Sequence, residues 1–245
     1  MISEQMTPYF IVGVVALVAA AFQSGTGLGY AIISMSVWQM LMPFRTASAV
    51  EAITVCLLCV TLLIRLRRHV RLKALITPLI ATTVFLPLGM HTMMIQVDAF
   101  MRQLMGILLL ALCVYFIFFG ERFRVRPTIG NGLIAGALSG FLGGMFNIGG
   151  PPLAIYFLST TDDKLEYSAS LQAIFMLMAP YHIILHAIWG NITLQTLRFS
   201  AAAVLGMAVG SVLGFMVFKR LSMPVLKRVV YCFMAVFGLY LVISG

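Results

Sequence analysis

The chain has 245 residues, of which 62% are hydrophobic and only 9% are charged, and its mean hydropathy is +1.06. A soluble domain is roughly 45–50% apolar and about 25% charged, so this composition excludes a soluble enzyme and predicts an all-α, polytopic membrane protein. The net charge of +9 comes from short basic runs between apolar stretches, which is typical of membrane topology signals and not of nucleic-acid binding.

Ten apolar stretches follow one another along the chain, and most are long enough for a helix that crosses a hydrocarbon core of about 30 Å. The stretches at 28–42 and 151–159 are shorter than a normal span. The full set lies at about 8–22, 28–42, 46–64, 74–95, 100–119, 128–146, 151–159, 168–189, 197–218 and 224–244.

Two junctions, at 22–30 and 146–153, differ from ordinary loops. They read FQSGTGLGY and FNIGGPPL, so both are Gly-rich and neither carries a charge. Unpaired backbone groups in hydrocarbon cost several kcal/mol each unless protein or water satisfies them, so such breaks indicate a cavity. A helix that starts just after a break would offer N–H groups and a positive dipole end to an anion. The alternative is that the glycines only allow close helix packing.

The two breaks lie about 122 residues apart, which is half of the chain. Residues 49–53 align with 170–174 at an offset of 121, and Gly89 falls on Gly210 at the same offset. This order predicts two homologous halves, 1–120 and 128–245, joined by a basic linker at 121–127.

The basic residues predict the sidedness of the helices. If each break only kinked one long span, the 16 Lys and Arg residues would divide almost evenly between the two sides. If each break is the tip of a hairpin, all of them share one side except Arg45, Arg102 and Arg198. The positive-inside rule favours the hairpins. Each half is then a re-entrant hairpin plus three transmembrane helices, the halves are inverted, and both termini face away from the cytoplasm. Hairpins made of full spans have the same parity.

Polar residues near the breaks are the candidate substrate-binding residues. They can hydrogen-bond an anion without charge, and the glycines allow its close approach to the backbone. The set comprises Gln23, Ser24, Gly25, Thr26, Gly27, Asn147, Gly149, Gly150 and Gln172.

Glu51 is the only acid well inside an apolar stretch, roughly 8 Å below its start at 1.5 Å per residue. A lone intramembrane carboxylate is a functional candidate by default, so Glu51 could carry a coupling proton. Its repeat mate is Gln172, which cannot titrate, so a hydrogen-bonding role that supports the site is an equal alternative.

His182 and His186 are spaced i, i+4 on one predicted helix. Proton coupling or support of the site competes here with ordinary amphipathic residues near a helix end, and no third ligand accompanies them for a metal. The chain has no catalytic or cofactor motif, such as H-E-x-x-H, G-x-S-x-G or a phosphate-binding loop, so we expect no enzyme activity, metal or cofactor. Two further glycine stripes predict close helix packing: Gly132, Gly136 and Gly140, and Gly206, Gly210 and Gly214.

The breaks also carry a family resemblance. The segments Gly25–Tyr30 and Gly143–Leu153 resemble the two Gly-rich signatures of the sulfite exporter TauE/SafE family, with Asn147 where glycine is more usual. The length, the duplication and the basic loop after the second span fit as well, so the resemblance covers essentially the whole chain. It implies a bacterial inner-membrane transporter, usually an exporter, of sulfite, sulfoacetate or related sulfonates.

The residues themselves support a secondary carrier that works by alternating access and holds a small anion between the hairpin tips near the midplane. Expected partners are the anion, protons and the lipid bilayer. An anion channel and a membrane subunit of a larger complex are the alternatives.

Overall fold

The computed structural model of the chain describes residues 2–118, 125–218 and 223–244. Within these ranges it has α-helices, one short 3-10 helix at Arg67–His69 and no strand, which confirms the predicted all-α class. The helices are α1 (Ile2–Thr26), α2 (Tyr30–Leu41), α3 (Phe44–Leu66), α4 (Leu72–Ile95), α5 (Asp98–Phe118), α6 (Ile129–Phe146), α7 (Gly150–Thr160), α8 (Lys164–Ile188), α9 (Leu194–Phe218) and α10 (Met223–Ser244).

Seven helices in the described residues are long and apolar enough to cross a membrane, namely α1, α3, α4, α5, α6, α8 and α9. Helices α2 and α7 have 12 and 11 residues, or about 18 and 16 Å at 1.5 Å per residue. They are therefore too short to span, as expected for the short arms of the two hairpins. Large apolar side chains are exposed on the long helices, which suits contact with lipid. The chain is a multi-pass integral membrane protein.

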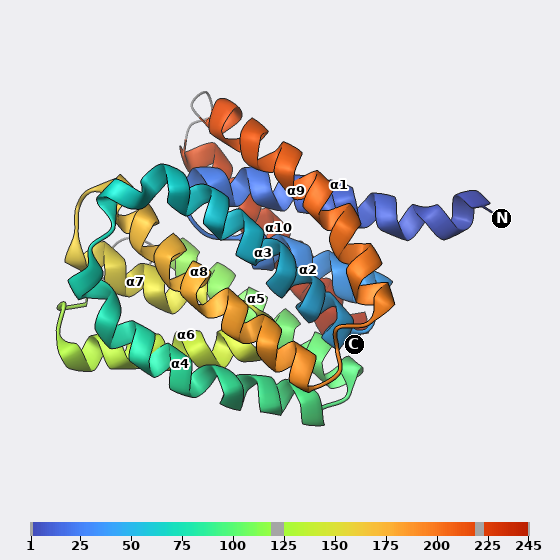
Figure 1. The fold of residues 1–245 in the computed structure, drawn as a ribbon, viewed down its shortest axis with the longest axis horizontal. Coiled ribbons are helices and arrows are strands. Elements are labelled where there is room, and N and C mark those ends of the chain that lie inside the picture. The colour runs from blue at the N-terminus through green and yellow to red at the C-terminus, as the bar shows by residue number, and fades with distance from the viewer. Residues whose placement is uncertain (1, 119–124, 219–222, 245) are drawn as a thin grey trace.

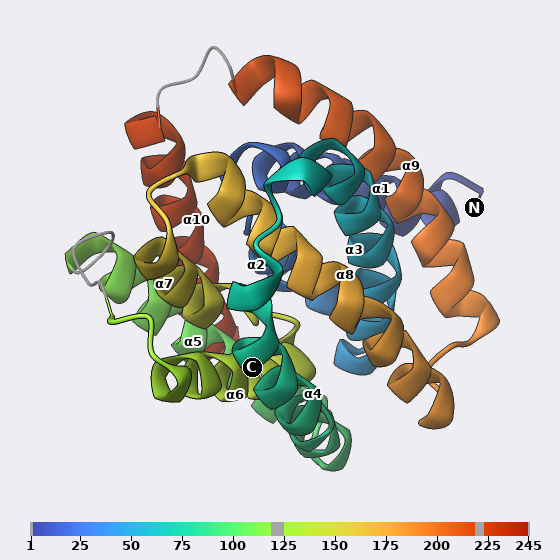
Figure 2. The same ribbon diagram turned by 60° about the vertical axis from the view of Figure 1, so that its left-hand side comes forward.

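The long helices pair across the two halves of the chain. Helix α1 packs on α9 at one edge of the molecule and α6 packs on α4 at the opposite edge, with α3 and α8 side by side between them (Figure 1). The turned view shows the same neighbours (Figure 2). Helix α5 packs on α10. The first helix of each hairpin thus lies against a helix of the other half.

Glycine stripes explain why these pairs approach so closely. A Cβ atom at Gly140 of α6 would lie 2.6 Å from the carbonyl oxygen of Thr82 on α4, and one at Gly136 would be closer still to that of Pro78. On α9, Gly206, Gly210 and Gly214 meet the α1 backbone in the same way. The structure confirms that both predicted stripes serve close helix packing.

Contacts between loops define two ends of the bundle. Arg71, just before α4, forms an ion pair with Glu166 at 2.8 Å and donates to the carbonyl of Thr160 at 3.1 Å. Gly132 near the start of α6 lies against Thr77 near the start of α4. The start of α6 and the end of α7 therefore lie at the same end, as a hairpin requires. We call it the basic end and define it by residues 67–71 and 161–164.

The opposite end holds the starts of α1 and α3 and the end of α4. Arg45 donates to the carbonyls of Met94 at 2.6 Å and Gln96 at 3.2 Å. The start of α1 and the end of α10 lie toward this end in Figure 1. Four of the basic residues used for the sidedness argument, Arg122, Arg124, Lys219 and Arg220, lie outside the described residues, as does most of the 121–127 linker.

Candidate functional site

The first break separates α1 from α2 by three residues. Gly27 and Gly29 have φ angles of +85° and +118°, a region that residues with a side chain rarely adopt. The Thr26 hydroxyl lies 2.6 Å from the carbonyl oxygen of Leu28 and 3.0 Å from that of Phe22. The break thus satisfies part of its irregular backbone with its own side chain.

Gln23 and Gln172, which we call the glutamine pair, bond two further backbone groups of the break. The Gln23 Oε1 atom accepts a hydrogen bond from the backbone N–H of Tyr30 at 3.0 Å, and its Nε2 atom lies 3.4 Å from Gln172 Oε1. Gln172 in turn donates to the carbonyl of Gly27 at 2.7 Å. Both side chains are buried. The glutamine pair therefore ties the first break to α8.

The second break begins at Asn147, which ends α6 with a φ of +63°. It is the one residue other than glycine with positive φ in the described part of the chain, and asparagine tolerates that conformation better than most residues. A Cβ atom at Gly149 would lie 2.7 Å from the carbonyl oxygen of Ser139, so close approach of the backbone requires glycine there. Helix α7 then starts at Gly150, and the next two residues are prolines without an N–H group.

Five polar residues around the second break form what we call the Glu51 network, consisting of Ser48, Glu51, Asn147, His186 and Asn191. Asn147 Nδ2 donates to Glu51 Oε2 and, at 3.0 Å, to the carbonyl of Ser48. The Ser48 hydroxyl donates to Asn147 Oδ1 at 2.6 Å and lies 3.2 Å from His186 Nε2. His186 Nδ1 lies 3.1 Å from Asn191 Nδ2. Glu51 is 2% exposed and His186 is fully buried.

The two tips sit at different depths along α3. Gln23 Nε2 of the first tip lies 3.7 Å from Cys59 Sγ, whereas Asn147 of the second tip bonds Glu51. These two positions on α3 are eight residues apart, or about 12 Å at 1.5 Å per residue. The two tips therefore overlap along the direction of α3 instead of meeting at one depth.

A cavity of about 90 Å³ lies between the two tips. Among the described residues that line it, none is Lys or Arg. His182 Nε2 is buried and has no hydrogen-bond partner among the described residues. Six of the predicted site residues line the cavity: Gln23, Glu51, Asn147, Gly149, Gly150 and His182.

The other predicted site residues lie elsewhere. Gly25 and Thr26 line a second cavity of about 520 Å³, which reaches Asp163 and Lys164 at the basic end. Ser24 lies against Gly214 of α9, where a Cβ atom would meet its side chain at 2.9 Å. The remaining three are absent from the lining of both cavities. Gln172 of the glutamine pair donates to the carbonyl of Gly27, and His186 belongs to the Glu51 network. Contact of any of these residues with substrate stays a prediction.

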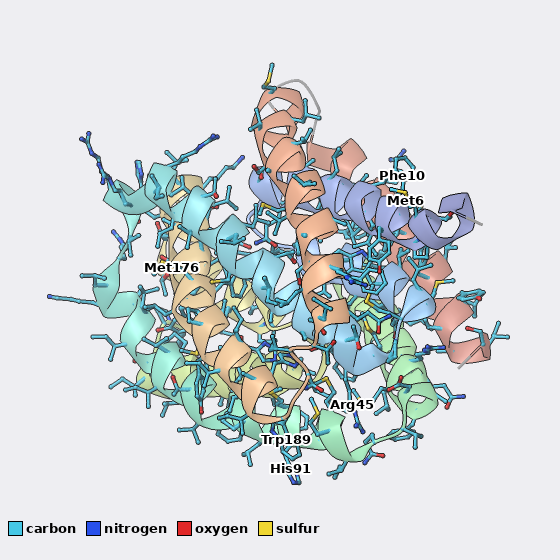
Figure 3. All side chains as sticks on the ribbon, turned by 45° about the vertical axis from the view of Figure 1, so that its right-hand side comes forward. Met6, Phe10, Arg45, His91, Met176 and Trp189 are labelled. Carbon is cyan, nitrogen blue, oxygen red and sulfur yellow. The ribbon has the colours of Figure 1, made fainter. Side chains whose placement is uncertain are left out.

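Sequence reasoning missed Ser48, Asn191 and Ser139. Ser48 lies one helical turn before Glu51, a spacing that places both side chains on one face of α3, so it could have been found from the position of Glu51. Nothing local in the sequence connects Asn191 or Ser139 with the breaks. His91, in contrast, packs edge-on against Trp189 with ring centroids 6.0 Å apart, at the surface of the bundle (Figure 3).

A family model described as "Sulfite exporter TauE/SafE" matches residues 12–241 of the chain. No curated protein and no solved structure matches closely enough to carry an argument.

Proposed function

Because the chain belongs to the sulfite exporter TauE/SafE family, we propose that it exports small sulfur oxyanions across the bacterial inner membrane by alternating access. The observation that carries this proposal is the cavity between the two breaks, which both hairpin tips, Glu51 and His182 line together. A carrier needs a site that two movable elements share near the middle of the fold, and the hairpin tips supply it.

The size and the lining of the cavity favour sulfite over larger sulfonates. Its volume of about 90 Å³ holds several water molecules at roughly 10–15 Å³ of accessible space each, which suits an anion of a few heavy atoms. Sulfoacetate brings an additional carboxylate, a second charged group for which the described lining offers no Lys or Arg. We therefore expect sulfite to bind more tightly than sulfoacetate.

The charges around the cavity favour a proton on Glu51 when the anion is bound. Two like charges about 4 Å apart repel by about 4 kcal/mol at an effective dielectric constant of 20. The described lining offers no Lys or Arg to offset that repulsion. Neutral donors are the remaining means of holding an anion, namely the backbone N–H groups at the second tip and His182, because both amide hydrogens of Asn147 already go to Ser48 and Glu51. Glu51 therefore takes up a proton before or with the anion.

We also infer that residues 1–120 and 128–245 are inverted halves, with both termini outside the cytoplasm. The pairing of α1 with α9 and of α6 with α4 supports this, because each half gives the first helix of its hairpin to the other half. The glutamine pair and the contact between Asn147 and Glu51 have the same reciprocal character.

The test is counter-flow of labelled sulfite into proteoliposomes that contain the purified chain. We expect saturable exchange of sulfite, weaker exchange of sulfoacetate and no exchange of acetate. Ohmic single-channel currents would support the channel alternative. Activity that required a second protein would support the subunit alternative, and exchange of no sulfur anion would contradict the proposal.

A further inference from the structure

Two pairs of side chains hold the two hairpin tips in corresponding ways. In each pair an amide from one break bonds a side chain on the helix that follows the other hairpin: Gln23 with Gln172 on α8, and Asn147 with Glu51 on α3. Gln172 and Glu51 both lie two turns into their helices. The pairs differ in one respect, because Glu51 can gain or lose a charge and the glutamines cannot.

The hydrogen bonds of the Glu51 network run in one direction. An amide oxygen only accepts, so the Ser48 hydroxyl donates its proton to Asn147 Oδ1. The Ser48 oxygen can then only accept from His186, which places the imidazole proton on Nε2. His186 Nδ1 is thereby left to accept from the amide of Asn191. The side-chain donors thus run from Asn191 to the Glu51 carboxylate, and the second N–H of the Asn147 amide goes to the carbonyl of Ser48.

We propose that the Glu51 network is a proton-controlled latch on the α6–α7 tip, with Ser48 and His186 as positioning residues for Asn147. Ionised Glu51 holds the Asn147 amide against α3 by a charge-assisted hydrogen bond, which is roughly twice as strong as a neutral one. Protonation of Glu51 removes that charge and loosens the tip. The glutamine pair holds the α1–α2 tip at every pH. The latch rests on the proposed function, because it supplies the tip movement that alternating access requires.

The helices packed around Glu51 bring few other titratable groups to it, so its charge acts mainly on the Glu51 network. Helices α6 and α7 contain no Lys, Arg, His, Asp or Glu, and α4 faces the cavity with Thr82 and Leu86. Arg198, the one basic residue in the described part of α9, is exposed near the start of that helix. Helix α5 meets α3 at its start, where Asp98 accepts from the backbone of Phe44 at 3.1 Å. The titratable groups that face Glu51 from its own and neighbouring helices are Cys59, Tyr30, His182 and His186.

The experiment measures sulfite counter-flow by the reconstituted full chain as a function of pH. Asn147→Gly keeps a residue that accepts positive φ and removes the amide, whereas Ser48→Ala removes one hydroxyl from a buried position and should fold. We expect both variants to shift the pH–rate curve toward alkaline pH, by about one unit for Asn147→Gly, because a donor to the ionised carboxylate is lost or misplaced. Glu51→Gln makes the pair permanently neutral, and its rate should keep only the pH dependence that comes from the protonation of sulfite itself and of groups other than Glu51.

Thr92→Ala is the matched control, because this exposed hydroxyl bonds the carbonyl of Leu88 within its own helix at 2.9 Å. Its pH–rate curve should coincide with that of the wild type. If wild type and control exchange sulfite with a clear pH dependence while Ser48→Ala and Asn147→Gly keep the wild-type curve, the latch is refuted and the transport function stands. If the wild type exchanges no sulfur anion, the proposed function itself has failed.

Discussion

Gly149 offers the most direct test of the second hairpin tip, because a single added methyl group is enough to displace the tip. Its φ of −85° is open to alanine, so the effect of Gly149→Ala is steric. The new Cβ atom would lie 2.7 Å from the carbonyl oxygen and 2.8 Å from the hydroxyl of Ser139, whereas ordinary contact begins near 3.4 Å. The tip and α6 must therefore separate by about 0.7 Å. Forcing an extra methyl group into a packed site typically costs about 1–3 kcal/mol.

If the cavity needs the tip in its present place, that strain appears as lost transport. Since about 1.4 kcal/mol corresponds to a tenfold change in rate, we expect sulfite counter-flow to fall roughly ten- to a hundredfold. Gly149→Leu should abolish transport while the protein still inserts in the membrane. Gly130→Ala is the control, because a Cβ atom there meets nothing within 4 Å. Wild-type transport by Gly149→Ala would refute the assignment of this tip to the site.

Three further predictions concern packing and topology. Gly140→Ala places a methyl group 2.6 Å from the carbonyl oxygen of Thr82, so it should lower the thermal unfolding temperature by separating α4 from α6. Gln23→Ala leaves the buried N–H at the start of α2 unpaired, and it should cost about 1–3 kcal/mol of stability, measured by thermal unfolding in detergent. Single cysteines in place of Arg68 and Asp162, in a background without the native cysteines, should react with an impermeant thiol reagent from the same side of the membrane.

Each of these outcomes has its own check. Gly130→Ala should unfold at the wild-type temperature, and an equal loss of stability in both glycine variants would contradict the packing argument. Stability unchanged by Gln23→Ala would show that water replaces the lost bond. Labelling of the two cysteines from opposite sides would exclude the α6–α7 hairpin, and a third cysteine in place of Val97 should react from the other side.

Local signals in the sequence were enough to predict much of the candidate site. The breaks could be predicted because glycine and proline interrupt apolar runs at the backbone level, where no distant partner is needed. Glu51 stood out because a carboxylate is rare inside an apolar span. The roles of single residues at the breaks were less predictable. Ser24 follows Gln23 directly, yet it faces α9, because helical rotation turns adjacent side chains by about 100°. Thr26 is the last residue of α1, and its hydroxyl bonds the backbone of the break.

Composition, hydropathy and charge were enough to decide that this chain is a helical membrane protein and where its spans and breaks lie, and two Gly-rich segments carried the family resemblance. The spans depend on the free energy of transferring each segment between water and lipid, so they can be predicted from one segment at a time. Only the tertiary structure decided which side chains meet. Gln23 bonds Gln172 across 149 residues and Asn147 bonds Glu51 across 96, contacts set by the way whole helices pack. Because no local pattern encodes helix rotation and depth, the glutamine pair and the Glu51 network emerge only once the fold is assembled.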